Sequence, residues 1–310
     1  MDTNKPILTI GPVFCDLLLQ GYQQMPAKGE ELYLKGYTVS LGGNAIVASA
    51  LAQLNVPASL LCTVGDDILG EYLISLMKGK NIGQEHVIRL DQTQTNVSFI
   101  FTQDGDRSFL TWLQENERYL REVQNHLTSI EASQFSHIHI CFELLGLPFV
   151  QEFLKAGRAA GVPTSTDLGF QDAQSWDEGS FAQLALVDYF FPNIDEAKLI
   201  TGSTELVQML QKLAQYVQEP VITLGEKGVA ALSKEHGVVF VPAPSVVVCN
   251  TTGAGDSFVA GFLYGRYHSM GLLESLQAGV VTGSLTAASF HSVSPEISEG
   301  VLQSKGVIHG

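Results

Sequence analysis

Residues 250–256 of this chain read NTTGAGD, a turn with few large side chains that ends on an acid. The apolar residues Phe258, Phe262 and Leu263 follow at helical spacing, so the sequence predicts a loop that leads into a helix. Bare backbone amides at a helix N-terminus bind anions, and the helix dipole strengthens that binding. Asp256 places a negative charge in this positive environment. A site that only binds an anion gains nothing from such a charge, so a general base is the more natural role for Asp256. The alternative is an acidic residue that only stabilises the first helical turn.

Length and charge limit the classes of protein to which the chain can belong. It has 310 residues, 45% of them hydrophobic, which is enough for one large or two small globular domains. Its net charge of −15 repels phosphate backbones, which argues against nucleic acid and anionic membranes as partners. A local basic site for a small anion is still compatible with this charge.

The sequence predicts a cytoplasmic protein. The first residues carry neither a basic segment nor a long apolar run, and no uninterrupted apolar run reaches membrane-spanning length. The cysteines are widely spaced and form no CxxC pair: Cys15, Cys62, Cys141 and Cys249. Reduced thiols without a metal or disulfide role are expected, with a catalytic cysteine as the alternative.

Two histidines, His137 and His139, alternate with Ile138 and Ile140, which is the pattern of a strand. Both imidazoles then lie on one face of that strand and could bind a metal ion. No third ligand lies near them in the sequence, which favours a structural role.

The rest of the chain alternates between strand-like and helix-like segments. The predicted strands are residues 7–10, 58–64, 135–141, 163–167, 189–191 and 221–224. The predicted helices are residues 44–54, 68–78, 148–160, 207–217, 253–268 and 273–288. This alternation predicts an α/β fold, a parallel sheet covered by helices on both faces, with ligands at the carboxyl ends of the strands.

Two regions, 17–40 and 93–112, depart from this alternation and are richer in strand formers and turns. Residues 96–101 and 107–113 flank an Asp-Gly pair, which predicts a β-hairpin. With residues 32–39 it would form a small sheet that serves as a lid or as a dimer surface. We find no linker, so we expect a single domain, 1–310, with lid strands from about 12–40 and 93–113.

Several motifs occur in the order found in one enzyme family. They are GGNA at 42–45, VGDD at 64–67, FPNIDEA at 191–197, TLGEKG at 223–228 and the segment 250–256. Together they resemble the phosphofructokinase-B-type carbohydrate kinases of the ribokinase-like superfamily. The resemblance covers essentially the whole chain and implies a three-layer α/β/α fold, with a mostly parallel central sheet and a small β-sheet lid.

The resemblance implies phosphoryl transfer from ATP to a hydroxyl group. Asp256 would take the proton from the acceptor hydroxyl as the general base. The amides of Gly253, Ala254 and Gly255 would hold the charge that develops on the transferred group. Such transfer depends on positioning and charge neutralisation more than on covalent chemistry.

The resemblance also implies the cofactor and metal sites. Asn193 and Glu196 would serve the ATP phosphates and Mg²⁺, and Glu196 would act through water, because Mg²⁺ keeps several of its waters. The nucleotide would lie along the segment 223–228, through Thr223, Gly225 and Gly228, with Gly255 at its phosphates. Taken from the residues alone, Asn193 and Glu196 also fit a helix cap, and 223–228 also fits a tight turn.

On the acceptor side, the resemblance places a group of residues at a sugar. Carboxylates and bare backbone suit a polyol, because hydroxyls donate to the former and approach the latter closely. These residues are Asp16, Gly42, Gly43, Asn44, Glu143 and Asp256. The alternatives are a strand-end turn for Asp16 and a solvated loop acid for Glu143.

The sequence departs from the family pattern at three places. Asn250 stands where the family commonly has Asp beside a monovalent cation, which puts a K⁺ site in question. Ile46 stands at the usual first-helix Asn, with Asn44 as its substitute, and 167–171 lacks the Asp-Pro-Asn-x-Arg of some ketohexose and ketogluconate kinases. These departures predict a less polar acceptor pocket, which leaves open an acceptor other than ribose or fructose.

The leading hypothesis is an ATP- and Mg²⁺-dependent kinase of a sugar or related small alcohol, with a homodimer through the lid. Ile46 and Phe14 keep a nucleoside kinase of the same fold open as an alternative. A catalytically weak sugar- or nucleotide-binding sensor is the second alternative, against which the intact Asp256 argues. Neither a GxxxxGK[ST] loop nor a GxGxxG turn after the first strand is present.

Overall fold

The computed structural model describes residues 5–22, 24–103, 106–114 and 116–308. The Asp104-Gly105 pair of the predicted hairpin lies outside these ranges. None of the helices within them is both long and apolar enough to cross a membrane.

The larger sheet has nine strands in the order β13-β12-β11-β10-β9-β8-β1-β4-β5. Its strands are β1 (Ile7–Ile10), β4 (Ala58–Gly65), β5 (Val87–Leu90), β8 (His137–Cys141), β9 (Thr164–Asp167), β10 (Tyr189–Phe191), β11 (Glu219–Thr223), β12 (Val229–Ser233) and β13 (Gly237–Val241). The pairs from β5 to β11 are parallel, while β12 and β13 add an antiparallel edge. The predicted mostly parallel central sheet is therefore confirmed.

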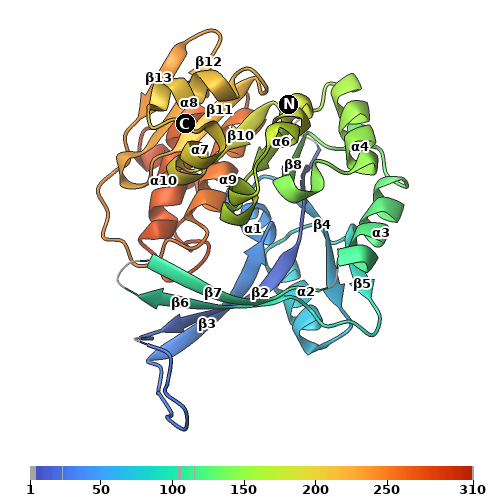
Figure 1. Ribbon diagram of the computed structural model, residues 1–310, viewed down its shortest axis with the longest axis vertical. Helices are drawn as coiled ribbons and strands as arrows, with labels where there is room; N and C mark the ends of the chain where they lie inside the picture. Colours follow the sequence, from blue (N-terminus) through green and yellow to red (C-terminus); the bar gives the residue numbers. More distant parts are fainter. Residues whose placement is uncertain (1–4, 23, 104–105, 115, 309–310) are drawn as a thin grey trace.

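Helices cover both faces of this sheet (Figure 1). They are α1 (Ala45–Gln53), α2 (Ile68–Gly79), α3 (Asn116–Leu127), α4 (Pro148–Ala159), α5 (Phe170–Gln174), α6 (Glu178–Gln183), α7 (Ile194–Thr201), α8 (Leu206–Leu213), α9 (Ala254–Tyr267), α10 (Leu272–Ala287) and α11 (Glu299–Ser304). Short 3₁₀ turns are η1 (Ala132–Gln134), η2 (Phe142–Leu144), η3 (Leu184–Leu186) and η4 (Gly225–Lys227).

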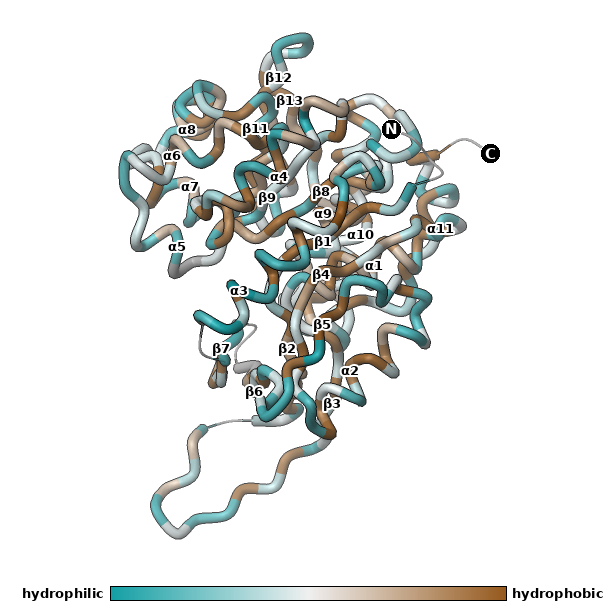
Figure 2. Tube along the Cα trace, turned by 90° about the vertical axis from the view of Figure 1, so that its right-hand side faces the viewer, coloured by the Kyte–Doolittle hydropathy of each residue, from teal (hydrophilic) through white to brown (hydrophobic). Residues whose placement is uncertain are grey.

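Strand residues that are adjacent in sequence pack into different cores, which produces the three layers. Ile7 and Val221 belong to the core under α1, α9 and α10, whereas Leu8 and Ile222 belong to the core under α3, α4 and α8. The side chains of a strand alternate between its two faces, so apolar residues at successive positions require a cover on each face. Figure 2 shows these hydrophobic strands enclosed by helices.

The smaller sheet has four strands in the order β3-β2-β6-β7 and lies across one end of the larger sheet (Figure 1). Its strands are β2 (Val13–Gln20), β3 (Gly36–Gly43), β6 (Val97–Gln103) and β7 (Asp106–Trp112). The predicted hairpin is confirmed as the antiparallel β6–β7 pair. The prediction of a strand over 32–39 is wrong at its start, because the ladder with β2 begins at Gly36 opposite Gln20, which leaves 32–35 without a partner strand.

Close helix packing fixes the position of α9. A Cβ atom at Gly261 would lie 2.3 Å from Thr282 Oγ1 and 2.6 Å from the Ala278 carbonyl oxygen of α10. A Cβ atom at Gly279 of α10 would similarly lie 2.8 Å from the Phe258 carbonyl oxygen. Because glycine has no side chain, the backbones of α9 and α10 approach closely at these two positions. This packing holds α9 against the rest of the core.

Candidate active site

The segment 250–256 forms a turn that leads directly into α9. Asn250 Oδ1 accepts a hydrogen bond of 3.0 Å from the Thr252 N–H, which closes the turn. Gly253 has a φ of +75°, and a Cβ atom there would lie 2.0 Å from the Ser292 carbonyl oxygen. Gly255 differs, because nothing lies within 4 Å of a Cβ atom at that position. The backbone thus requires glycine at position 253. At position 255 a side chain would point into open space.

Asp256 lies in the first turn of α9 and is partly exposed. Burial raises its pKa to about 7, the charge of Asp167 adds to that rise, and the positive charge of Arg107 opposes it. A carboxyl group with this pKa accepts a proton more readily than an ordinary aspartate, and it is still largely ionised just above neutral pH.

Asp16 of β2 lies near enough to Asp256 for the two carboxyls to interact electrostatically. It is 5% exposed, and burial together with the charge of Asp256 raises its pKa to about 8. A Cβ atom at Gly42 would lie 2.2 Å from the Asp16 carboxylate, so the bare backbone of β3 is needed for this carboxylate to fit. Gly43 follows with a φ of +60°, and a Cβ atom there would lie 2.3 Å from the Pro12 carbonyl oxygen.

Asn44 has a structural partner. It precedes α1 and its Nδ2 donates to the Ile10 carbonyl oxygen at 3.2 Å. Ile46, two residues later, lies 3.2 Å from the position of a Cβ atom on Gly253. The first turn of α1 therefore packs directly under the turn of α9.

Glu143 lies in η2, just beyond the end of β8. Burial and the charge of Asp172 raise its pKa. It lines a small pocket of about 30 Å³ together with Pro12, Thr63, Asn96, Leu113, Gln114 and Tyr119. The pocket joins lid strands to the larger sheet and offers mixed polar and apolar contacts.

Asn193 and Glu196 form a reciprocal cap on α7. Asn193 Oδ1 accepts from the N–H groups of Asp195 and Glu196 at 2.9 and 3.0 Å, and Glu196 Oε2 accepts from the Asn193 N–H at 2.8 Å. Burial raises the pKa of Glu196 to about 7. Asn193 also pairs with Thr223 in a parallel bridge, which connects the cap to the end of β11.

The segment 223–228 runs from β11 through η4 into β12. Gly225 has a φ of +60° with nothing within 4 Å of a Cβ atom. Gly228 has a φ of +108°, and a Cβ atom there would lie 2.0 Å from the Val241 carbonyl oxygen. Gly228 therefore has a structural requirement of its own, since the chain leaving β13 passes against it.

The structure adds three charged residues that sequence reasoning missed. Arg107 of β7 reaches from the lid sheet and donates to Thr251 Oγ1 at 2.7 Å. Asp167 ends β9, and Asp172 of α5 accepts from the Gly169 N–H at 3.2 Å. Burial, with the charge of Asp172, raises the pKa of Asp167 to about 6. A polar residue at the carboxyl end of a predicted strand is the signal that could have identified Asp167.

These residues are compatible with Mg²⁺ held mainly by phosphate and water. The described residues include no group of three or more His, Cys, Asp or Glu that could hold a metal ion by themselves. Asp167, Glu196 and Asp256 nevertheless produce a negative field, because Asp167 raises the pKa of both other carboxyls. Mg²⁺ at phosphate sites typically takes one or two carboxylates, directly or through water.

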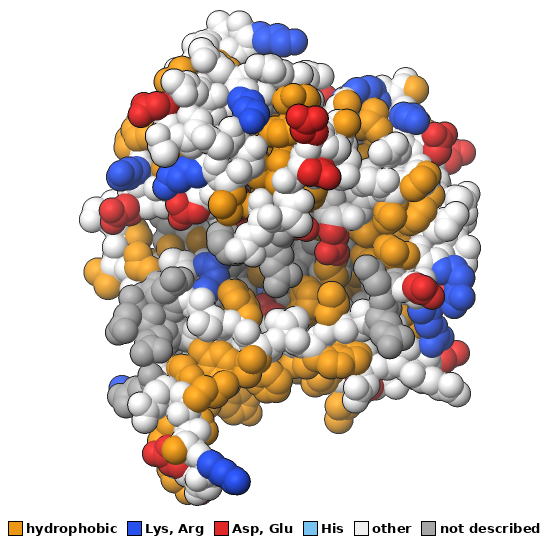
Figure 3. All heavy atoms as spheres, in the orientation of Figure 1, with side chains coloured by type: hydrophobic (Ala, Val, Ile, Leu, Met, Phe, Trp, Pro, Cys, Tyr) orange, Lys and Arg blue, Asp and Glu red, His pale blue; other side chains and the backbone are white. Residues whose placement is uncertain are grey.

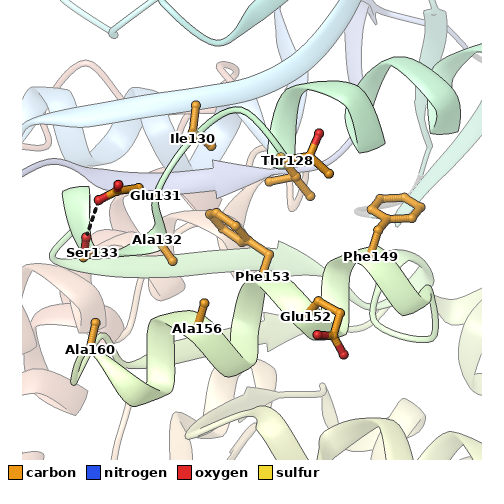
Figure 4. A pocket seen from close by; sticks show the side chains of 11 residues that line it. Thr128, Ile130, Glu131, Ala132, Ser133, Phe149, Glu152, Phe153, Ala156 and Ala160 are labelled. Carbon is orange, nitrogen blue, oxygen red and sulfur yellow. Dashed lines mark hydrogen bonds between the residues drawn. The ribbon is translucent and has the colours of Figure 1, made fainter.

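A second cavity is separate from these residues. It has a volume of about 420 Å³ and lies between α4 and the segment that follows α3, with Ile130, Phe149 and Phe153 among its lining residues (Figure 4). None of the predicted site residues lines it.

Known proteins of similar sequence and structure have the same type of fold. The chain is 24% identical over 302 residues to a deoxyribokinase from Salmonella typhi, covering 93% of this chain and 96% of the relative. It is similar to the structure of Arabidopsis thaliana ribokinase complexed with ribose and ATP, with a TM-score of 0.77, 21% identity and 99% of each chain covered. It is also similar to the Burkholderia thailandensis nucleoside kinase in complex with inosine, with a TM-score of 0.76, 21% identity and 97% of each chain covered.

The model of the pfkB family carbohydrate kinases matches residues 7–298. That match spans both sheets and every motif on which the resemblance depends. It confirms the predicted enzyme class, and the chain belongs to the pfkB family of carbohydrate kinases.

Proposed function

We propose that this kinase transfers the γ-phosphoryl group of ATP to a hydroxyl of a sugar or sugar-like molecule, with Asp256 as the general base. The observation that carries the proposal is the juxtaposition of Asp256, the bare start of α9 and the buried Asp16. Asp256 accepts the hydroxyl proton while the amides of Gly253, Ala254 and Gly255 stabilise the charge on the transferred group.

The acceptor would lie between the lid and α9. Asp16 and Glu143 accept hydrogen bonds from its hydroxyls, and the backbone of Gly42 and Gly43 allows close approach. The amide of Asn44 is already bound to the Ile10 carbonyl, so Asn44 shapes this pocket more than it binds the acceptor. The deoxyribokinase relative and the ribose in the Arabidopsis ribokinase structure favour a pentose-sized acceptor.

The nucleotide would lie along Thr223, Gly225 and Gly228, with its phosphates toward Asn193 and the start of α9. Mg²⁺, when bound, supplies charge neutralisation at the phosphates, and Glu196 would hold it through water. Arg107 brings a positive charge from the lid to the proposed phosphate site, and this charge lowers the pKa values of Asp256 and Glu196. Arg107 would therefore stabilise the phosphoryl group when the lid covers the acceptor.

The substitution Asp256→Asn should lower kcat by about 10³-fold or more, because the hydroxyl proton loses its acceptor. Affinity for ATP, measured by titration calorimetry on the same preparation, should stay close to wild type. Asp195→Asn on the exposed surface of α7 is the matched control and should keep wild-type turnover. Near-normal turnover by the Asp256 variant would sink the base assignment.

The two glycines at the start of α9 should respond differently to alanine. Gly255→Ala adds a methyl group where the phosphoryl group would lie, so kcat should fall by about 10²-fold. Its free energy of unfolding should stay equal or rise by up to about 1 kcal/mol, because alanine favours a helix. Gly253→Ala should instead destabilise the fold by about 1–3 kcal/mol, because its Cβ meets the Ser292 carbonyl. Full activity in Gly255→Ala would contradict the anion site.

A screen of free sugars and nucleosides for acceptor-dependent ADP release distinguishes the remaining alternatives. We expect turnover with a free sugar, whereas turnover confined to nucleosides would establish the nucleoside kinase instead. Tight binding of an acceptor without ADP release would favour the sensor.

Running the screen in KCl and in choline chloride tests K⁺ dependence. Equal rates are expected, because Asn250 supplies no carboxylate for the cation.

The outer face of the lid sheet would be covered by a second copy of the chain. Tyr37, Phe99, Leu110 and Trp112 are each 40% exposed or more, and Figure 3 shows hydrophobic side chains gathered over these strands. Light scattering should therefore give twice the 33.5 kDa chain mass, and Phe99→Asp should reduce it to one chain. Tyr72→Asp on α2 is the control, and a wild-type protein of single-chain mass would refute this dimer.

A further inference from the structure

A row of polar side chains crosses the buried interior of the larger sheet. Five residues stand side by side on consecutive strands: Thr9, His139, Ser165, Tyr189 and Glu219. The first three are 0% exposed. Polar groups buried in this way reduce stability unless they are hydrogen-bonded, so each of them should have an assignable partner.

Ser165 connects two histidines in this interior. Its Oγ lies 2.7 Å from His137 Nε2 and 2.9 Å from His139 Nδ1. Burial lowers the pKa of both histidines, that of His139 to about 3, so both imidazoles are neutral at physiological pH. Each therefore has one N–H donor and one acceptor nitrogen, and the serine hydroxyl has one proton to share between them.

The second nitrogen of His139 faces the active-site edge of the sheet. His139 Nε2 lies 3.8 Å from Asp167 Oδ1 and has no hydrogen-bond partner among the described residues. Asp167 is the last residue of β9, and its charge acts on the Asp256 carboxyl. His139 thus connects the buried row to a carboxyl group beside the base.

Two arrangements of protons satisfy both hydrogen bonds that Ser165 makes with His137 and His139. In the first, His137 Nε2–H donates to Ser165, Ser165 donates to His139 Nδ1, and His139 presents an Nε2–H group to Asp167. In the second, every donor is reversed, and His139 presents a lone pair. A lone pair repels the Asp167 carboxylate and tolerates only its protonated form. An ionised Asp167 therefore selects the first arrangement.

We propose that His139 is a positioning residue for phosphoryl transfer: Ser165 fixes its ring, Asp167 selects its Nε2–H tautomer, and the N–H dipole in turn favours the ionised form of Asp167 beside Asp256. This inference rests on the proposed function, because it concerns the base of that reaction. With Asp167 ionised, Asp256 is the carboxyl of the pair that takes up a proton more readily. His139 thereby directs proton uptake to the residue that meets the acceptor hydroxyl.

Other titratable or charged groups also face this pair of carboxyls and contribute to their titration. They are Asp172 of α5, Glu196 of α7, Glu143 and Cys141 at the end of β8, Asp16 of β2 and Arg107 of β7. His139 stays a neutral imidazole through the pH range of these titrations, so its effect comes from the direction of its N–H bond and depends on its tautomer.

The first test is the tautomer itself, measured by long-range ¹H–¹⁵N correlation on the histidine-labelled wild-type protein. We expect His139 to carry its proton on Nε2 between pH 6 and pH 8, with signals assigned from the His139→Gln and His137→Gln spectra. A proton on Nδ1 would overturn the inference. This measurement requires no acceptor, so it decides the question even if the proposed kinase reaction fails.

The second test is the pH profile of kcat/KM. Without the N–H group, Asp167 holds its proton more tightly and the repulsion on Asp256 falls, so the acid limb of His139→Phe should move about 1 pH unit lower. His137→Phe is the matched control, equally buried and in contact with Ser165 but not with Asp167, and its acid limb should stay in place. His139→Gln restores an N–H donor and should return the limb toward wild type. Identical limbs for His139→Phe and His137→Phe would overturn the inference.

Discussion

The dominant constraint on this site is the crowding of carboxyl groups at one edge of the central sheet. Burial and mutual repulsion raise the pKa values of Asp16, Asp167, Glu196 and Asp256 to between about 6 and about 8. The unfolded chain releases these protons near pH 4, whereas the folded chain holds them to higher pH. Their contribution to stability is therefore greatest in acid and is lost as pH rises through the folded pKa values. In the proposed reaction, one of these raised pKa values belongs to the carboxyl that accepts the hydroxyl proton.

The rest of the architecture keeps these carboxyls in place. Parallel strands bring the ends of β9, β10 and β11 to the same edge, and close packing of α9 on α10 fixes the helix that carries Asp256. The lid sheet contributes Asp16 and Arg107, and Arg107 supplies positive charge to a strongly acidic neighbourhood. The electrostatics of the proposed site therefore depend on both sheets, which explains why the motifs are spread over the whole sequence.

Much of the fold follows from local pattern, and much of the site from a few motifs. Alternating apolar segments identified the sheet, and the glycines before Asp256 identified the turn. Arg107 was missed because a side chain on a hairpin reveals its target only when the hairpin is placed. Helix α3 was also missed, although Tyr119, Val123 and Leu127 recur at four-residue spacing and are buried. The partners of His139 depend on strand register, which sequence periodicity does not determine.

The central claim is that Asp256 is an unusually basic carboxyl in the free enzyme. Titration of the carboxyl ¹³C resonances of aspartate-labelled protein tests this claim most directly, with the Asp256 signal assigned by its absence from the Asp256→Asn spectrum. A midpoint near pH 7 is the expected result, together with a second perturbed midpoint for its neighbour Asp167. A single midpoint near 4 for Asp256 would show an ordinary surface aspartate and contradict the account.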